Sequence, residues 1–367
     1  MEPHGRRILY DGWGLARQPN QPAALHMIEL LNHCPEDFVP VLALPGEQAP
    51  PADIPARTQR VILPVEDTPT GRLRWEQRML AQAAEQAQAE LVHLTTSTPA
   101  LWGGPPVVIS PAGFEASALP SGGSLPARLR KALSKGAEHR VRAVLWPEDL
   151  PAPAVAAPIW RLPGLVAPDF NPADPPDASI QAALEMPEAY LLYHGPQEPW
   201  HLERLMAVWS WAAGSIGELF PLVILGFGTA EQSRQLSQLM HKHRLERFMK
   251  ILPDVSASAV ASIYRGSAGL LHFGEVAAWG GPVRYALACG KPVVADETIR
   301  ADALVGSAGY LFSQQEARRM GAALLTVVVN EDVNQGLHEA ARVQAARWQS
   351  TNFSRQLGAV YAQVMDG

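Results

Sequence analysis

Short apolar runs alternate with amphipathic stretches along almost the whole chain, which is the pattern of a parallel-sheet α/β protein. In the first half, the amphipathic stretches repeat apolar residues every three or four positions, as helices do. The predicted strands there are residues 7–10, 39–44, 60–65, 91–94, 107–110, 143–146 and 159–162, and the predicted helices include 23–32, 73–90 and 126–142.

The second half repeats this alternation after a proline-rich segment, residues 163–177, which is typical of an interdomain linker. Each half therefore resembles a Rossmann-type domain. The predicted strands of the second half are 190–193, 222–225, 249–252, 269–272 and 292–295, and the predicted helices are 201–213, 230–243, 256–264, 314–328, 333–347 and 354–365.

Composition narrows the class of protein. With 367 residues, 47% of them hydrophobic, the chain is long for a single core. The net charge of −6 argues against nucleic-acid binding. Cys34 and Cys289 lie in apolar helical contexts, as buried thiols of a reducing cytoplasm do. We expect a cytoplasmic protein without signal peptide or membrane span, and neither metal ligands nor a cofactor motif.

The most informative segment runs from Trp279 to Ala295. Gly280-Gly281-Pro282 opens a short apolar helix, Gly290 ends it, and a buried strand follows. A helix that starts on two glycines and a proline leaves backbone N–H groups bare, and such a terminus suits a phosphate group.

This segment resembles the donor-site motif of family 4 glycosyltransferases. The resemblance covers nearly the whole chain and implies the GT-B fold: two Rossmann-like domains that face a cleft, with a final helix crossing back. It implies an acceptor-side domain, residues 1–165 with 350–367, a linker, 166–177, and a nucleotide-sugar domain, 178–349. The matching scaffold positions are Gly280, Pro282, Val283, Ala286, Ala288, Cys289, Gly290, Pro292, Val293 and Val294.

The same resemblance implies where a nucleotide-sugar donor would bind. Most of these positions are backbone turns after strands, where amides approach phosphate, sugar or base. The expected donor-binding residues are Gly195, Gly226, Gly228, Pro253, Asp254, Trp279, Gly280, Gly281 and Glu297.

The charged groups that perform the family's chemistry are absent at the aligned positions. The family uses two glutamates, a histidine, an arginine and a lysine, and losing one such charge-stabilising group typically costs ~10²–10³ in rate. We therefore expect a glycosyltransferase-family protein that resembles retaining, nucleotide-sugar-dependent transferases but has degenerate catalytic motifs. The alternative is a non-catalytic protein that binds a nucleotide, a glycan or a partner glycosyltransferase subunit; a nucleotide-sugar epimerase is a third interpretation. The replacing residues are Ala277, Tyr285, Pro111, Pro196 and Trp200 or His201.

Three residues are candidate catalytic substitutes. Glu275 lies two positions before the first lost glutamate and reaches inward if its loop turns that way. Arg284 is either a diphosphate clamp or a solvated surface side chain, and His201 either carries partial charge near an anion or lies at a solvent-facing helix start.

The predicted helix 126–142 carries six basic residues and one acid, Glu138. By the resemblance, this helix would contact an anionic membrane at its inner face through Arg128, Arg130, Lys131 and Lys135; the alternative is a solvated helix face.

Overall fold

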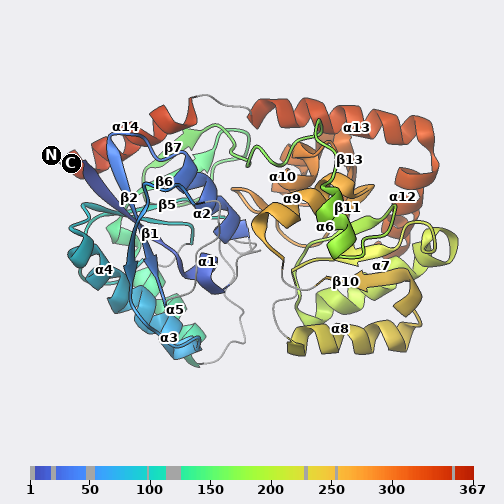
Figure 1. Ribbon diagram of the computed structural model, residues 1–367, viewed down its shortest axis with the longest axis horizontal. Coiled ribbons are helices and arrows are strands. Elements are labelled where there is room, and N and C mark those ends of the chain that lie inside the picture. The colour runs from blue at the N-terminus through green and yellow to red at the C-terminus, as the bar shows by residue number, and fades with distance from the viewer. Residues whose placement is uncertain are drawn as a thin grey trace. The chain divides into compact units, whose positions relative to one another are not determined.

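The computed structural model describes residues 5–17, 22–46, 54–96, 99–112, 125–226, 230–252, 255–348 and 352–367. The chain divides into two compact units (Figure 1). The first unit comprises Met1–Leu165, Ala277–Trp279 and Ser350–Gly367, and the second comprises Val166–Val276 and Gly280–Gln349.

The described part of the first unit contains a parallel sheet in the order β3-β2-β1-β4-β5-β6-β7. In register, Ile8 of β1 lies between Pro40 of β2 and Leu91 of β4. The strands are β1 (Arg6–Asp11), β2 (Phe38–Leu44), β3 (Gln59–Ile62), β4 (Leu91–Leu94), β5 (Val107–Ile109), β6 (Val141–Pro147) and β7 (Ile159–Leu162).

The sheet of the second unit is also parallel, with its described strands in the order β10-β9-β8-β11-β12-β13. Leu191 of β8 pairs with Leu222 of β9 and Gly269 of β11. The strands are β8 (Leu191–Tyr193), β9 (Leu222–Ile224), β10 (Met249–Ile251), β11 (Gly269–His272), β12 (Val293–Asp296) and β13 (Gly309–Phe312). Both sheets reverse their order at one point, between β1 and β4 or β8 and β11, as doubly wound Rossmann folds do.

Helices connect the strands in both units. The first unit contains α1 (Trp13–Arg17), α2 (Pro22–Asn32), α3 (Pro69–Arg74), α4 (Leu80–Ala87), α5 (Leu125–Gly136), α14 (Phe353–Asp366), the π-helical turn η1 (Trp75–Met79) and the 3-10 turn η2 (Glu138–Arg140). The second contains α6 (Ala178–Ala183), α7 (Pro199–Ile216), α8 (Ala230–His243), α9 (Ala257–Gly266), α10 (Gly281–Ala288), α11 (Ile299–Val305), α12 (Ala317–Val329), α13 (Glu331–Ala345) and the 3-10 turns η3 (Glu246–Phe248), η4 (Gly306–Ala308) and η5 (Ala346–Trp348).

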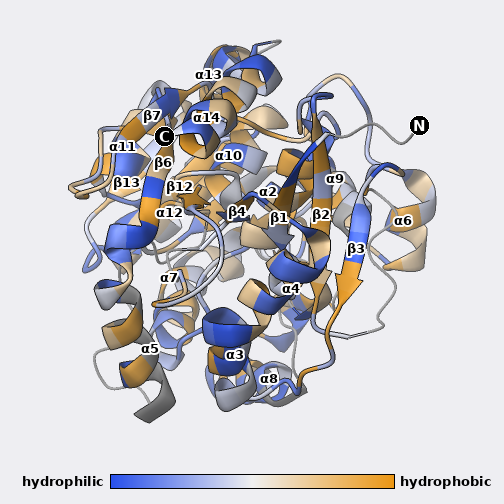
Figure 2. Ribbon diagram, turned by 90° about the vertical axis from the view of Figure 1, so that its left-hand side faces the viewer, coloured by the Kyte–Doolittle hydropathy of each residue, from blue (hydrophilic) through white to orange (hydrophobic). Residues whose placement is uncertain are grey.

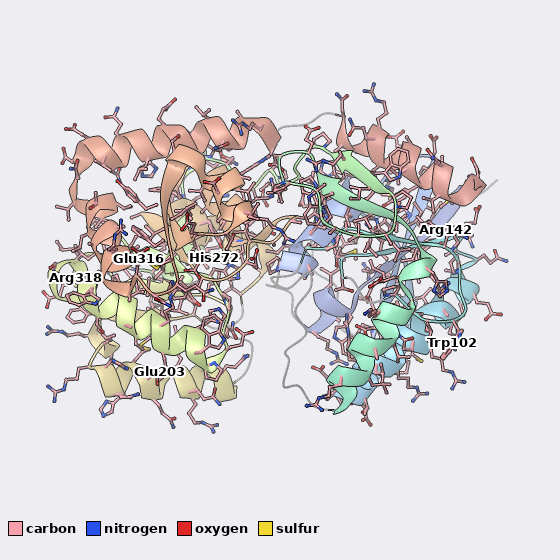
Figure 3. All side chains as sticks on the ribbon, turned by 180° about the vertical axis from the view of Figure 1, so that it is seen from behind. Trp102, Arg142, Glu203, His272, Glu316 and Arg318 are labelled. Carbon is pink, nitrogen blue, oxygen red and sulfur yellow. The ribbon has the colours of Figure 1, made fainter. Side chains whose placement is uncertain are left out.

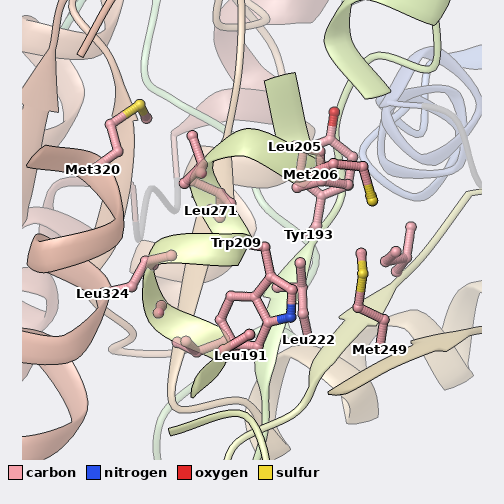
Figure 4. Close-up of a cluster of buried hydrophobic side chains, with 14 of the residues drawn as sticks. Leu191, Tyr193, Leu205, Met206, Trp209, Leu222, Met249, Leu271, Met320 and Leu324 are labelled. Carbon is pink, nitrogen blue, oxygen red and sulfur yellow. The ribbon is translucent and has the colours of Figure 1, made fainter. Parts of the chain in front are cut away.

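The apolar runs of the sequence form the interior of each unit. Hydropathy along the ribbon shows strongly polar stretches on helices such as α3 (Figure 2). In the second unit, the strand residues Leu191, Leu222 and Leu271 pack with Trp209 of α7 and Leu324 of α12 (Figure 4). Burial on both faces explains why these strands read as continuous apolar runs instead of alternating ones.

The predicted strands are all present, with ends that differ by at most a few residues, but three differences stand out. The edge strand β13 and the short helices α1, α6 and α11 were not predicted. Helix 73–90 is instead α3, η1 and α4 in succession, with Thr68 capping its start. Helix 126–142 was predicted too long, because α5 ends at Gly136 and β6 begins at Val141.

A buried chain of hydrogen bonds fixes α14 to the first unit's sheet. The Tyr361 hydroxyl lies 3.0 Å from that of Tyr10 and 2.6 Å from Nδ1 of His93. Nε2 of His93 contacts Ser110 Oγ at 2.9 Å, and Ser110 Oγ lies 3.1 Å from Nε2 of His26. The last helix is therefore anchored to β1, β4 and β5 by polar as well as apolar contacts.

Within the ranges that the structure describes, no helix is both long and apolar enough to span a membrane.

Candidate functional site at the carboxyl edge of the second sheet

The carboxyl ends of β8, β11 and β12 bring together the polar residues of the second unit. Ligands of doubly wound sheets bind beyond these strand ends, at the point where the strand order reverses. Here that point lies between β8 and β11. The segment His194–Glu198 follows β8, Phe273–Glu275 follows β11, and Asp296 ends β12.

His201 is the most distinctive side chain at this edge. It lies in the first turn of α7, whose N-cap is Glu198. Oε2 of Glu198 lies 2.9 Å from Nδ1 of His201, and this hydrogen bond is the main cause that lowers the pKa of Glu198. A carboxylate only accepts, so Nδ1 carries the proton and Nε2 faces away from Glu198.

The second ring nitrogen of His201 is buried and without a partner. His201 is only 6% exposed, and no described residue makes a hydrogen bond to its Nε2. A Cβ built on Gly274 would lie 3.5 Å from this nitrogen, which places Nε2 against the loop that follows β11. A buried polar atom of this kind calls for a partner that the protein does not supply.

Arg204 and Asp296 form a buried ion pair beside His201. Both Arg204 Nη atoms donate to the Asp296 carboxylate, one at 2.7 Å, and the guanidinium lies 4.3 Å from the Phe273 ring centroid. Asp296 also accepts the Gly274 N–H at 2.8 Å. The pair therefore ties α7 to β12 and to the loop after β11, and the charge of Arg204 is already neutralised.

His272 and His194 are buried at this edge of the sheet, inside the second unit. His272 ends β11 inside the second unit (Figure 3), and its Nδ1 and Nε2 lie 3.3 and 3.4 Å from the carbonyl oxygens of His194 and Glu275. Burial lowers the pKa of His272. Nδ1 of His194 lies 2.8 Å from the Tyr264 hydroxyl. Both nitrogens of His272 are engaged within the fold, and His194 is engaged through Nδ1.

Glu275 is exposed, and no described residue donates a hydrogen bond to its carboxylate. Arg300, whose charge interacts with that of Glu275, donates to the Val276 carbonyl at 3.1 Å. Burial lowers the pKa of Arg300, while the charge of Glu275 opposes that shift. Glu275 thus lies at the predicted edge, free to meet a ligand.

Arg284 is not a surface side chain, and the solvated interpretation was wrong. It is fully buried, and its guanidinium lies 4.9 Å from the ring centroid of Trp348. The physical reason is that all eight residues of α10 are buried, so no face of this helix is left for solvent.

Tyr285 is the residue that the sequence resemblance aligns with the family's second glutamate. Its ring is 2% exposed and stacks on Phe170, with centroids 4.2 Å apart. Gly280 has φ of 60°, and a Cβ there would lie 2.6 Å from the Tyr285 hydroxyl. An aromatic contact therefore fills the space beside the start of α10.

Trp279 belongs to the core of the first unit. Its Nε1 donates to the Leu145 carbonyl at 2.9 Å, and its ring stacks on His26 at 5.2 Å. Because both its face and its N–H are engaged, Trp279 offers no platform for a sugar.

The structure describes some of the other predicted donor-binding residues, and the rest lie outside the described part of the chain. Gly195 follows β8, Gly226 has φ of 99° and its carbonyl accepts from the Gln197 amide, and Glu297 is exposed after β12. Gly228, Pro253 and Asp254 lie outside the described residues.

A polar cluster that the sequence analysis missed lies where β1 of the first unit ends. Oδ1 of Asp11 accepts from Trp13 N at 3.0 Å and from Trp75 Nε1 at 2.8 Å. Arg72 lies 3.7 Å from Asp11 Oδ2 and donates to Glu76 at 2.6 Å. The π-helical turn η1, a feature that often marks functional sites, carries Trp75 and Glu76. From the sequence alone, the only sign of this cluster is the carboxylate of Asp11 at the end of an apolar strand.

The basic residues predicted to share one helix, 126–142, belong to α5, η2 and β6. Arg128 and Lys135 are exposed on α5, whereas the side chains of Arg130 and Lys131 lie outside the described residues. Arg142 lies on β6, and Arg140 donates to the carbonyls of residues 100, 104 and 105. Among the residues placed in the structure, no group of acidic, histidine or cysteine side chains has the geometry of a metal site.

Comparison with known proteins identifies the architecture. No family model matches the sequence, and no curated protein matches it. Among solved structures, sucrose-phosphate synthase from Thermosynechococcus elongatus matches with a TM-score of 0.74 and 14% identity over 98% of this chain and 99% of that one. WaaG, a glycosyltransferase involved in lipopolysaccharide biosynthesis, matches with a TM-score of 0.72 and 13% identity over 96% and 99%.

A third structure is Anabaena Alr3699/HepE in complex with UDP-glucose, with a TM-score of 0.65 and 15% identity over 97% and 99% of the two chains. At such identities the likeness concerns the fold alone. These neighbours are glycosyltransferases of the GT-B type, so the chain has the two-domain, parallel-sheet α/β fold of GT-B glycosyltransferases.

Proposed function

We propose that this chain binds a nucleotide sugar at the carboxyl edge of the second unit's sheet and has lost the retaining sugar transfer that the family resemblance implies. The observation that carries the proposal is the buried, unpartnered Nε2 of His201. It lies against Gly274, at the point where the sheet order reverses.

A diphosphate is the ligand chemistry that suits this nitrogen. Glu198 orients the ring through Nδ1, which leaves Nε2 for a ligand. The protonated ring donates from Nε2 to a phosphate oxygen, with Glu198 balancing the added charge. The resemblance also puts this position near the family's diphosphate-clamping lysine, and one neighbouring structure is a complex with UDP-glucose.

Loss of transfer is supported because the charged groups that the family uses are absent or already engaged in this chain. Ala277 is buried in place of one glutamate, and Tyr285 packs on Phe170 in place of the other. Arg284 is buried, and Arg204 is neutralised by Asp296. One imidazole is then left to stabilise a leaving diphosphate, a role in which each missing donor typically costs ~10²–10³ in rate.

The binding experiment is thermal unfolding of the full chain against nucleoside diphosphates and nucleotide sugars, with and without magnesium. Ligand at about one hundred times its dissociation constant stabilises by roughly 2.7 kcal/mol. We expect a selective shift with one nucleotide, and a much smaller shift in His201→Gln.

The matched control is His241→Gln. His241 also pairs with a glutamate, Glu246, but on the exposed surface of the same unit. Its loss should leave the ligand-induced shift unchanged. No shift with any nucleotide, or equal shifts in wild type and His201→Gln, would refute the proposal.

Turnover is tested separately, by following hydrolysis of the nucleotide sugar that binds, alone and with simple sugar acceptors. We expect a rate near the uncatalysed one. Hexosyl transfer that depends on His201 or Glu275 would instead identify an active transferase with a rebuilt donor pocket.

A further inference from the structure

A second concave site lies at the opposite, amino edge of the same sheet. The segment Cys289–Lys291 joins the end of α10 to β12, and α13 packs beside it. Between them is a cavity of about 530 Å³ within the second unit. Its lining residues are Pro172, Cys289, Gly290, Lys291, Asn334, Gln335, His338, Glu339 and Arg342.

The cavity contains a lysine without a counter-charge. Lys291 is partly buried, and no described residue forms an ion pair or hydrogen bond with its ammonium group. Cys289 is no counter-ion, because burial raises the pKa of its thiol to about 12 and keeps it neutral. Burial and the charge of Arg342 lower the pKa of Lys291. An ammonium held this way is stabilised by an anion that enters from solvent.

Arg342 supplies a second cation on the same wall. Its only carboxylate neighbour in the described chain is Glu339, at 3.5 Å, and both side chains are more than half exposed. Such an exposed pair is weak, so the guanidinium remains available to a better acceptor. Its stem packs at Gly290, where a Cβ would lie 3.3 Å from Arg342 Cγ.

His338 adds an acceptor that selects among anions. Its Nδ1 donates to the Gly290 carbonyl, and burial lowers the pKa of the ring, which keeps it neutral. A carbonyl cannot donate, so the proton is on Nδ1 and Nε2 is an acceptor. Together with the amide of Gln335, this lining offers cations for an oxyanion and neutral groups for hydroxyls.

We propose that this cavity binds a phosphate group, either as inorganic phosphate or on a hydroxylated phosphate monoester, between Lys291 and Arg342. The juxtaposition of an unpaired lysine, a weakly paired arginine and neutral polar groups in one cavity carries the inference. The site lies on the other edge of the sheet from His201 and does not depend on nucleotide binding there.

The test is calorimetric titration of the full chain with inorganic phosphate, glycerol phosphate, sulfate and glycerol. We expect saturable binding of both phosphates, weaker binding of sulfate, which has no proton for His338, and none of glycerol. Lys291→Gln and Arg342→Gln should each weaken phosphate binding about tenfold. Lys291→Arg, which keeps the charge, should restore most of it.

Two controls separate this site from other sources of affinity. Arg347→Gln removes an exposed positive charge just after α13 that does not line the cavity, and it should bind phosphate as wild type does. His201→Gln should likewise retain phosphate binding, whether or not nucleotide binding is found. Tighter binding of glycerol phosphate than of phosphate would identify a monoester as the ligand, and the reverse would identify the free anion.

A stability measurement guards against misfolded variants. Without ligand, Lys291→Gln should be at least as stable as wild type, because it removes an uncompensated charge. At one phosphate concentration, the ligand should stabilise wild type clearly more than this variant. Equal phosphate affinity in wild type and Lys291→Gln, or the same loss in Arg347→Gln, would overturn the proposal.

Discussion

The buried histidines His93 and His201 differ in what each ring nitrogen contacts, and this difference distinguishes a structural histidine from a candidate binding residue. His93 is fully buried with both nitrogens engaged, by Tyr361 and Ser110. His201 is nearly as buried but has one nitrogen engaged, by Glu198. The first pattern is that of a residue that supports the fold, and the second agrees with the ligand contact that we propose for His201.

Protonation of His93 makes the free energy of unfolding of the first unit depend on pH. Burial lowers its pKa to about 3, well below the value of about 6.5 in an unfolded chain. Between these values the unfolded state binds more protons, so stability rises with pH there, by up to ~1.4 kcal/mol per pH unit. The contribution is complete above the unfolded pKa and is lost as pH falls toward the folded one. We expect His93→Gln to flatten this slope in urea unfolding between pH 4 and 7.

The control is the exposed His241→Gln, whose pH slope should match that of wild type. An unchanged slope in His93→Gln would mean that other groups set the acid sensitivity of the first unit.

A substitution at Gly280 tests the packing of Tyr285, the residue aligned with the family's second glutamate. Its φ of 60° costs a non-glycine residue roughly 1–2 kcal/mol, and a Cβ would also lie 2.6 Å from the buried Tyr285 hydroxyl. We therefore expect Gly280→Ala to destabilise the second unit by at least ~2 kcal/mol in urea unfolding. Gly336→Ala, in the open interior of α13, should instead stabilise it by ~0.5–1 kcal/mol. Equal effects would show that the backbone at Gly280 adapts.

At the scale of elements, the Arg204–Asp296 pair connects a helix, a strand and a loop. Asp296 is 1% exposed, so removing its charge leaves Arg204 uncompensated, which typically costs ~3–5 kcal/mol. We expect Asp296→Asn to lose stability of this order and to speed hydrogen exchange at the Gly274 amide. The double variant Arg204→Met/Asp296→Asn should recover part of the loss, because it also removes the stranded cation.

The comparison pair is Lys242–Glu203, which is exposed on both sides. Lys242→Gln should cost less than ~1 kcal/mol. If Asp296→Asn is as mild as Lys242→Gln, the pair does not hold the loop.

The elements themselves were largely predictable, since buried parallel strands leave apolar runs that local sequence reveals. β13 was missed because each of its residues is only partly buried, and α5 was overextended because its pattern continues into β6. The site was harder. Arg204 and Asp296 are 92 positions apart, and only the fold brings them together.

The motif alignment also did not reveal that every side chain of α10 is buried. The glycines that begin and end α10 were recognisable from the sequence. The structure explains their presence, because the φ values of 60° at Gly280 and 68° at Gly290 favour glycine. The aligned position of Arg284 gave no sign that α13 and neighbouring helices enclose α10 on every side. Its role as clamp or surface residue therefore could not be decided before the packing was known.

For the whole molecule, the two units preserve the GT-B fold at low sequence identity to the neighbouring structures. The apolar strands and glycine turns that build each sheet are present, and the neighbouring structures match the chain at only 13–15% identity. A fold persists under such divergence because its core needs volume and pattern, whereas chemistry needs particular groups at particular atoms.

Helix α14 provides a test of how the chain builds its first unit. Phe353, Leu357, Val360 and Tyr361 are fully buried although they lie at the far end of the sequence. Fully burying such side chains contributes ~1.5–3 kcal/mol each, and their sum approaches the 5–15 kcal/mol typical of a domain. A chain that ends at residue 349 would also strand the polar groups of Tyr10 and His93.

We therefore expect this truncation to unfold the first unit and spare the second. Hydrogen exchange should be fast in β1 and β4 but remain slow in β8 and β11, whose core residues come from the second unit's own segments. Tyr361→Phe, which keeps the ring and removes only the hydroxyl, should be milder, at ~1–3 kcal/mol. Slow exchange in β1 after truncation would mean that the first unit folds without its last helix, and α14 would then be an attachment to a finished core instead of part of it.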